Sequence, residues 1–97
     1  MTRLTVVTAL RSEYAALSGR VPAAQLLRCG MGRERVSAWL PRLREAAPEA
    51  VVVAGVAGGV DPSLRPGDIV VASEVRDDRG RTVLRGAAPL VAELRRM

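Results

Sequence analysis

Apolar runs alternate along the chain with segments whose apolar residues recur at helical spacing. Four runs are expected to form strands, and they lie at Leu4–Thr8, Gln25–Cys29, Ala50–Val56 and Asp68–Val75. Their β-branched, apolar content is typical of strands in a buried sheet. Between these runs, helices are expected at Arg11–Leu17 and Arg33–Ala47. In the second, the apolar residues Val36, Leu40 and Leu43 recur one or two helical turns apart.

Turn residues separate these segments and continue to the end of the chain. Asp61-Pro62 is expected to open a short turn, and Pro66-Gly67 has the residues of a type II turn. Asp77 to Gly80 is a further turn signal, followed by a short strand at Arg81–Leu84. Residues Pro89–Met97 are expected to begin a helix.

Strands that alternate with helices favour a mainly parallel sheet, because right-handed crossovers place the helices on both faces. We therefore expect an α/β fold, three-layer α/β/α, in a single domain over residues 1–97. Ligands of such sheets bind at the carboxyl ends of the strands. Three segments follow strand ends in this chain and are expected to share one cleft, namely Thr8–Glu13, Gly30–Gly32 and Val56–Gly59.

Charge and composition narrow the classes of function. The net charge is +5 and all 15 basic residues are Arg, but they are spread along the chain and only Tyr14 and Trp39 are aromatic. A nucleic-acid role is therefore not favoured, because it needs clustered charge and stacking platforms. No apolar run reaches the about 18 residues of a membrane span. We expect a cytoplasmic protein.

The residues that bind metals or form covalent intermediates are scarce. Cys29 is the one cysteine and the chain has no histidine. An intramolecular disulfide, a zinc site and a Cys-His pair are therefore not expected within the chain. We expect no metal and no cofactor.

Paired glycines follow the third predicted strand. Gly58 and Gly59 lack Cβ atoms, so the backbone there can take positive φ and let a ligand approach its amides. In the same way Gly30 and Gly32 open the second predicted helix, whose free amides can receive an anion or a ribose hydroxyl. An ordinary strand-to-helix turn explains that pair equally well.

Three motifs in this order resemble the nucleoside phosphorylase and nucleosidase superfamily, which includes the methylthioadenosine/S-adenosylhomocysteine nucleosidases. They are a Gly-x-Ala-Gly-Gly loop with a later Gly-Asp-Ile-Val-Val strand, a Ser-Gly-x-Gly-Lys/Arg element, and a first strand with an acidic residue after it. In this chain they lie at Gly55–Gly59 with Gly67–Val71, at Cys29–Arg33 and at Leu4–Glu13. The resemblance implies a phosphorylase/hydrolase-like fold, a homo-oligomer, and cleavage of the N-glycosidic bond of a purine nucleoside by water or by phosphate as co-substrate.

The resemblance also implies roles for single residues. Glu13 would activate the attacking water, although an acidic residue in the first turn of a helix also complements the helix dipole. Met31 would line the pocket for the 5′ substituent, or fill the core. The expected substrate-binding residues are Ala9, Leu10, Gly30, Met31, Gly32, Val56, Ala57, Gly58 and Gly59.

Val56 departs from many relatives, which carry a hydroxyl residue there to hold the attacking water or phosphate. The difference fits a divergent branch such as the hopanoid-associated nucleosidases, which the run Val60–Asp68 also resembles. Asp68 itself is expected to fix the turn before its strand.

The family's later half supplies a Met-Glu pair that grips the ribose and an Asp that protonates the leaving purine. Neither is among these 97 residues, so we expect a domain incomplete at its C-terminus, and whether the chain alone is an enzyme stays open. The alternative is a noncatalytic α/β module that binds a nucleoside or completes an oligomer.

Overall fold

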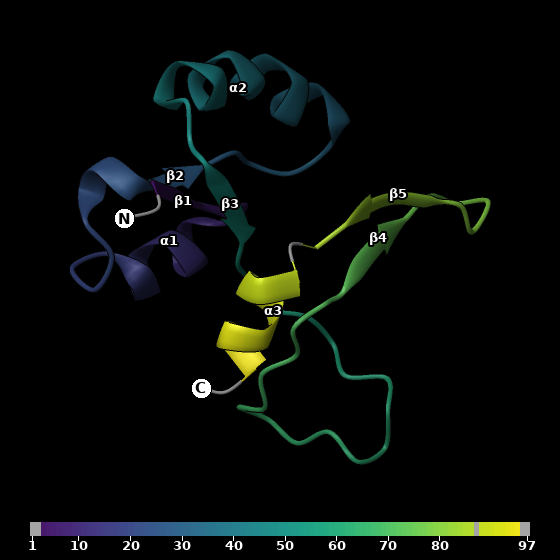
Figure 1. The fold of residues 1–97 in the computed structure, drawn as a ribbon. Coiled ribbons are helices and arrows are strands. Elements are labelled where there is room, and N and C mark those ends of the chain that lie inside the picture. Colours follow the sequence, from purple (N-terminus) through teal and green to yellow (C-terminus); the bar gives the residue numbers. More distant parts are fainter. Residues whose placement is uncertain (1–2, 87, 96–97) are drawn as a thin grey trace. The chain divides into compact units, whose positions relative to one another are not determined.

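The computed structural model describes residues 3–86 and 88–95. The chain forms two compact units, one up to Gly58 and one from Gly59 onward. Figure 1 shows the order of their elements along the chain. Each unit is described by itself.

The first unit is built on a parallel sheet. Its strands β1 (Leu4–Thr8), β2 (Leu26–Arg28) and β3 (Ala50–Val53) lie in the order β2-β1-β3. Val6 of the central strand lies opposite Leu26 on one side and Val52 on the other. The core of the unit therefore lies along β1, where the residues from Thr5 to Thr8 are buried.

Helices flank this sheet, as the α/β expectation requires. Helix α1 (Arg11–Leu17) has the predicted bounds, a short 3-10 helix, η1 (Ala23–Gln25), precedes β2, and α2 (Arg33–Ala46) follows it. Figure 1 shows α1 and α2 on opposite sides of the sheet. The expected α/β fold with a parallel sheet is confirmed for this unit.

Two details of the first unit differ from expectation. The third strand ends at Val53 instead of Val56, and Val53 is 81% exposed. An apolar run was expected to be buried, but β3 lies at an edge of its sheet, where part of its surface stays uncovered. On α2 the buried side chain is Trp39, while Leu40 of the predicted apolar stripe is 37% exposed.

The second unit begins with two turns that match the sequence signals. Asp61 accepts hydrogen bonds at Oδ1 from the amide and the hydroxyl of Ser63, at 2.8 and 2.7 Å. In the type II turn the Asp68 amide donates to the Arg65 carbonyl at 3.0 Å, and Gly67 has the required positive φ of 93°. Asp68 Oδ2 in return accepts from the Arg65 amide at 2.9 Å, so its predicted role in the turn is confirmed.

The prediction of a strand at Asp68–Val75 is wrong for most of that range. The structure has β4 only at Glu74–Arg76, paired antiparallel with β5 (Thr82–Arg85). Ile69 and Val70 are 83% and 71% exposed. A β-branched run indicates that a segment can form a strand, but hydrogen-bonding partners decide whether it does. Helix α3 (Ala88–Arg95) follows, and the last two residues of the helix expected there lie outside the described residues.

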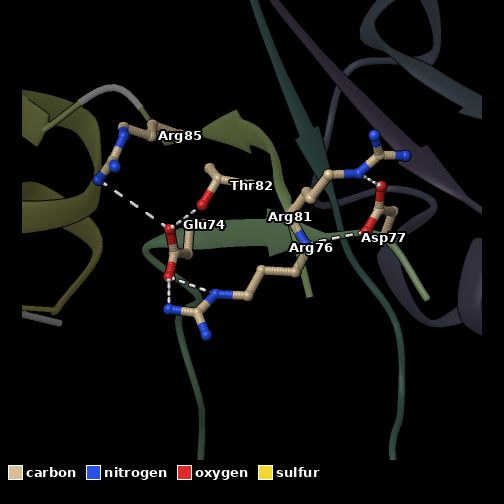
Figure 2. A network of polar contacts seen from close by, with 6 residues as sticks. All are labelled: Glu74, Arg76, Asp77, Arg81, Thr82 and Arg85. Carbon is tan, nitrogen blue, oxygen red and sulfur yellow. Dashed lines mark hydrogen bonds and ion pairs between the residues drawn. The ribbon is translucent and has the colours of Figure 1, made fainter. Parts of the chain in front are cut away.

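Acidic side chains hold the β4–β5 hairpin together (Figure 2). Asp77 Oδ1 accepts from the Arg79 and Arg81 amides, both at 2.9 Å, and its Oδ2 accepts from Arg81 Nε at 2.9 Å. Glu74 accepts from Arg76 Nε at 2.8 Å and from the Thr82 hydroxyl at 3.0 Å. These contacts fix the hairpin and its turn, as the Asp77 to Gly80 signal predicted.

Candidate functional site

The carboxylate of Glu13 lies where the ends of two strands meet. Its Oε1 accepts hydrogen bonds from the amides of Leu10 at 2.9 Å and Ala9 at 3.2 Å, just after β1. Its Oε2 accepts from the amide of Val56 at 2.9 Å, just after β3. Four of the residues singled out in the sequence are thus brought together by one side chain.

Hydrogen bonds to the charged form lower the pKa of Glu13. The Val56 amide is the largest cause and the Leu10 amide the next, while partial desolvation opposes them and the Ala9 amide adds to the lowering. Glu13 is therefore ionised at neutral pH. An ionised Glu13 can accept a hydrogen bond from the attacking water, as the first expected role requires. It also lies in the first turn of α1, where the helix dipole favours negative charge, as the second requires.

Gly55 makes room for this carboxylate. A Cβ atom built on Gly55 would lie 2.5 Å from Glu13 Oε2, closer than any real contact of this kind. In the sequence Gly55 is part of the glycine motif, where no role was predicted for it. The signal that points to it is a glycine at the end of an apolar strand, where backbone and ligand or side chain approach closely.

The glycines before α2 adopt the conformation that their residue type allows. Gly30 and Gly32 have positive φ values of 79° and 90°. The segment is attached to the central strand, because the Cys29 amide donates to the Thr8 carbonyl at 2.8 Å. Met31 between the glycines is 62% exposed and so is no core filler. Gly30, Met31 and Gly32 therefore lie beside the carboxyl ends of β1 and β2.

The paired glycines after β3 do not use the backbone freedom that their residue type gives. Neither Gly58 nor Gly59 has a positive φ. Val56, Ala57 and Gly58 are exposed and belong to the first unit, so they continue from the strand end that Glu13 holds. Gly59 belongs to the second unit and packs near the side chain of Leu64.

The described residues contain neither a cluster of metal ligands nor a helix that could span a membrane. Residues 3–86 and 88–95 contain no group of three His, Cys, Asp or Glu side chains that could hold a metal ion. None of the helices in these ranges is long and apolar enough to cross a membrane.

Comparison with known proteins gives a family match over most of the chain. The sequence profile of the phosphorylase superfamily matches residues 7–94. A 5'-methylthioadenosine/S-adenosylhomocysteine nucleosidase from Tolumonas auensis is 46% identical over 52 residues, which are 53% of this chain and 23% of that protein. One from Pseudoalteromonas translucida is 60% identical over 30 residues, 31% of this chain and 13% of that protein.

The matched segments therefore span less than a quarter of these curated relatives. No solved structure matches the chain. The family match extends from within β1 to within α3 and includes Glu13 and the glycine motifs at Cys29–Arg33 and Gly55–Gly59. The chain belongs to the phosphorylase superfamily.

Proposed function

We propose that this chain takes part in cleaving the N-glycosidic bond of a purine nucleoside, with Glu13 as the residue that holds the attacking water or phosphate. The observation that carries the proposal is the Glu13 carboxylate fixed between the ends of β1 and β3. The family, and the nucleosidase activity for which both relatives are named, support the reaction class.

The two oxygen atoms of Glu13 are placed for different tasks. Oε1 accepts two amide hydrogen bonds, which occupy both of its lone pairs, and so orients the carboxylate. Oε2 accepts one, from Val56, and keeps a lone pair for a further donor. We assign to Oε2 the hydrogen bond to the nucleophile.

In hydrolysis, water forms a bond to the anomeric carbon as the bond from that carbon to the base nitrogen breaks. The proton lost by the water passes to a general base, and the departing base takes up a proton from a general acid. The lowered pKa of Glu13 makes it a weak base. Its contribution is therefore largest in orienting the nucleophile and stabilising the positive charge that develops on the ribose.

Val56 has no side-chain hydroxyl for this nucleophile, and its amide already donates to Glu13 Oε2. The residue is 82% exposed. We therefore propose that the chain belongs to a branch without that hydroxyl, such as the hopanoid-associated nucleosidases. A phosphate co-substrate stays within the proposal, since either nucleophile can donate to Oε2.

A second candidate function is nucleoside binding without catalysis. It is favoured by one observation, that three amides already engage the carboxylate of Glu13 and hold its pKa low. The exposed Val51 and Val53 of the edge strand β3 support a homo-oligomer in either case. Sedimentation velocity would measure the oligomer directly.

The test is release of free base from a panel of purine nucleosides, with and without phosphate, by the wild-type chain and Glu13→Gln. The control is Glu34→Gln, which removes an acidic residue from the first turn of α2. The proposal predicts nucleoside-dependent release that only the Glu13 substitution slows, by at least about 100-fold. A phosphate requirement would identify phosphorolysis. Binding without release in every variant would favour the noncatalytic function.

A further inference from the structure

A hollow in the first unit lies between the end of β2 and one face of α2. Its volume is about 380 Å³, and its lining residues are Arg28, Cys29, Gly30, Arg35, Ala38, Trp39 and Arg42. The four residues from α2 are spaced at i, i+3, i+4 and i+7, so they share one face of the helix. Of the candidate substrate-binding residues only Gly30 lines this hollow, and Glu13 does not.

Three arginines line this hollow without a counter-charge. No acidic side chain is among its lining residues. Among the residues that the structure describes, the ion pairs involve only Arg76, Arg81 and Arg85, so Arg28, Arg35 and Arg42 are without one. Like charges around one hollow repel each other, and a bound anion would offset this repulsion because it attracts each of the three arginines.

The wall of the hollow contains a buried donor without an acceptor. The Trp39 side chain lies in a residue only 9% exposed, and its Nε1 atom has no hydrogen-bond partner in the described part of the chain. Buried donors of native proteins are nearly always satisfied, by protein, water or an ion. Trp39 lies on the same face of α2 as Arg35 and Arg42 and lines the hollow with them.

Backbone geometry keeps one arginine at the hollow. A Cβ atom built on Gly30 would lie 3.2 Å from Arg35 Cδ, so the arginine stem packs against the bare glycine backbone. Gly30 also has a φ of 79°, which other residue types rarely adopt. The glycine thus both shapes the turn and leaves space for Arg35.

We propose that this hollow binds a phosphate-type oxyanion through Arg28, Arg35 and Arg42, as free phosphate or as the phosphate of a small ester. Guanidinium groups present paired donors that match phosphate oxygens. The volume is near the lower limit of small-molecule sites, which fits a phosphate with a small organic group.

Isothermal titration with inorganic phosphate and with phenyl phosphate, at low salt, tests the proposal in the full chain. We expect saturable binding of one equivalent, and the two probes separate a free phosphate site from an ester site that also uses the indole wall. Arg35→Gln and Arg42→Gln should each weaken binding by about tenfold, the value of one charge-assisted hydrogen bond. These arginines are exposed, so helix content by circular dichroism should be unchanged.

The matched control is Arg44→Gln, which removes the same charge from the same helix but does not line the hollow. It should bind both probes like the wild type. Absence of saturable binding by the wild type, or equal weakening by all three substitutions, would overturn the proposal. Because binding is measured without catalysis, this result is independent of whether the chain cleaves nucleosides.

Discussion

The carboxylate of Glu13 accepts a hydrogen bond of 2.9 Å from the amide of Val56, a residue 43 positions later in the chain. This contact joins the helix that follows β1 to the end of β3. The same carboxylate is the group to which we assign the nucleophile. Structure and proposed chemistry therefore depend on one side chain, and experiments have to separate the two.

Gly55→Ala tests the space that Glu13 requires. The new Cβ would lie 2.5 Å from Oε2, so the carboxylate must move and lose contacts. We expect the free energy of unfolding to fall by about 1–3 kcal/mol, the usual cost of overpacking, measured by urea denaturation. Gly58→Ala is the matched control, since nothing lies within 4 Å of its Cβ position and its φ is not positive. An equal loss in both variants would contradict the account.

Glu13 should contribute to stability in a pH-dependent way. Its folded pKa lies below the ordinary value of 4.5, so the contribution is present above that value and is lost as the pH falls through the folded pKa. We expect the wild type to lose stability between neutral and acidic pH more steeply than Glu13→Gln. Thermal melts of both proteins across this range measure the difference. Parallel curves would show that Glu13 has no preferential interaction as a carboxylate.

The two glycines before α2 allow backbone strain to be separated from contact. Both have positive φ. A Cβ atom on Gly30 would lie 3.2 Å from Arg35 Cδ, whereas nothing lies within 4 Å of a Cβ on Gly32. Replacing either by Ala should destabilise the fold by about 1–3 kcal/mol through strain. Only Gly30→Ala should also weaken phosphate binding, which titration would show. Weaker binding in Gly32→Ala alone would contradict the assigned geometry.

The hairpin of the second unit depends on Asp77. The Arg81 amide is the largest cause of its lowered pKa, and the Arg79 amide and the Arg81 side chain add to it against partial desolvation. Asp77→Ala should open the turn between β4 and β5 and speed amide hydrogen exchange there. Asp78→Ala is the control, because no side-chain contact of Asp78 takes part in the network of Figure 2. Unchanged exchange in Asp77→Ala would show that the strands alone hold the hairpin.

Much of this architecture could be predicted from local sequence. The bounds of α1 and the turns at Asp61, Gly67 and Asp77 follow from helix spacing and from turn residues whose contacts lie within four positions. Such interactions are decided by neighbours in the chain.

The predictions from sequence were wrong where contacts between distant parts of the chain decide the structure. The run from Asp68 to Ser73 has strand composition but forms no strand. In β3 the side chains of Val51 and Val53 are exposed, because this strand lies at an edge of its sheet. Periodicity gives no information about partners. For the same reason Glu13 could be selected as acidic and near a strand end, while its bond to Val56 and its need for Gly55 required the fold.

The most direct test of the central claim is base release from adenosine-type nucleosides by the wild-type chain and by Glu13→Gln, each measured with and without phosphate. Glu34→Gln is the matched control, because it removes an acidic residue from the first turn of α2. We predict release by the wild type and by the control, and at least about 100-fold slower release by Glu13→Gln, because the nucleophile loses the carboxylate that orients it. No release by the wild type, or equal rates with and without Glu13, would contradict the account.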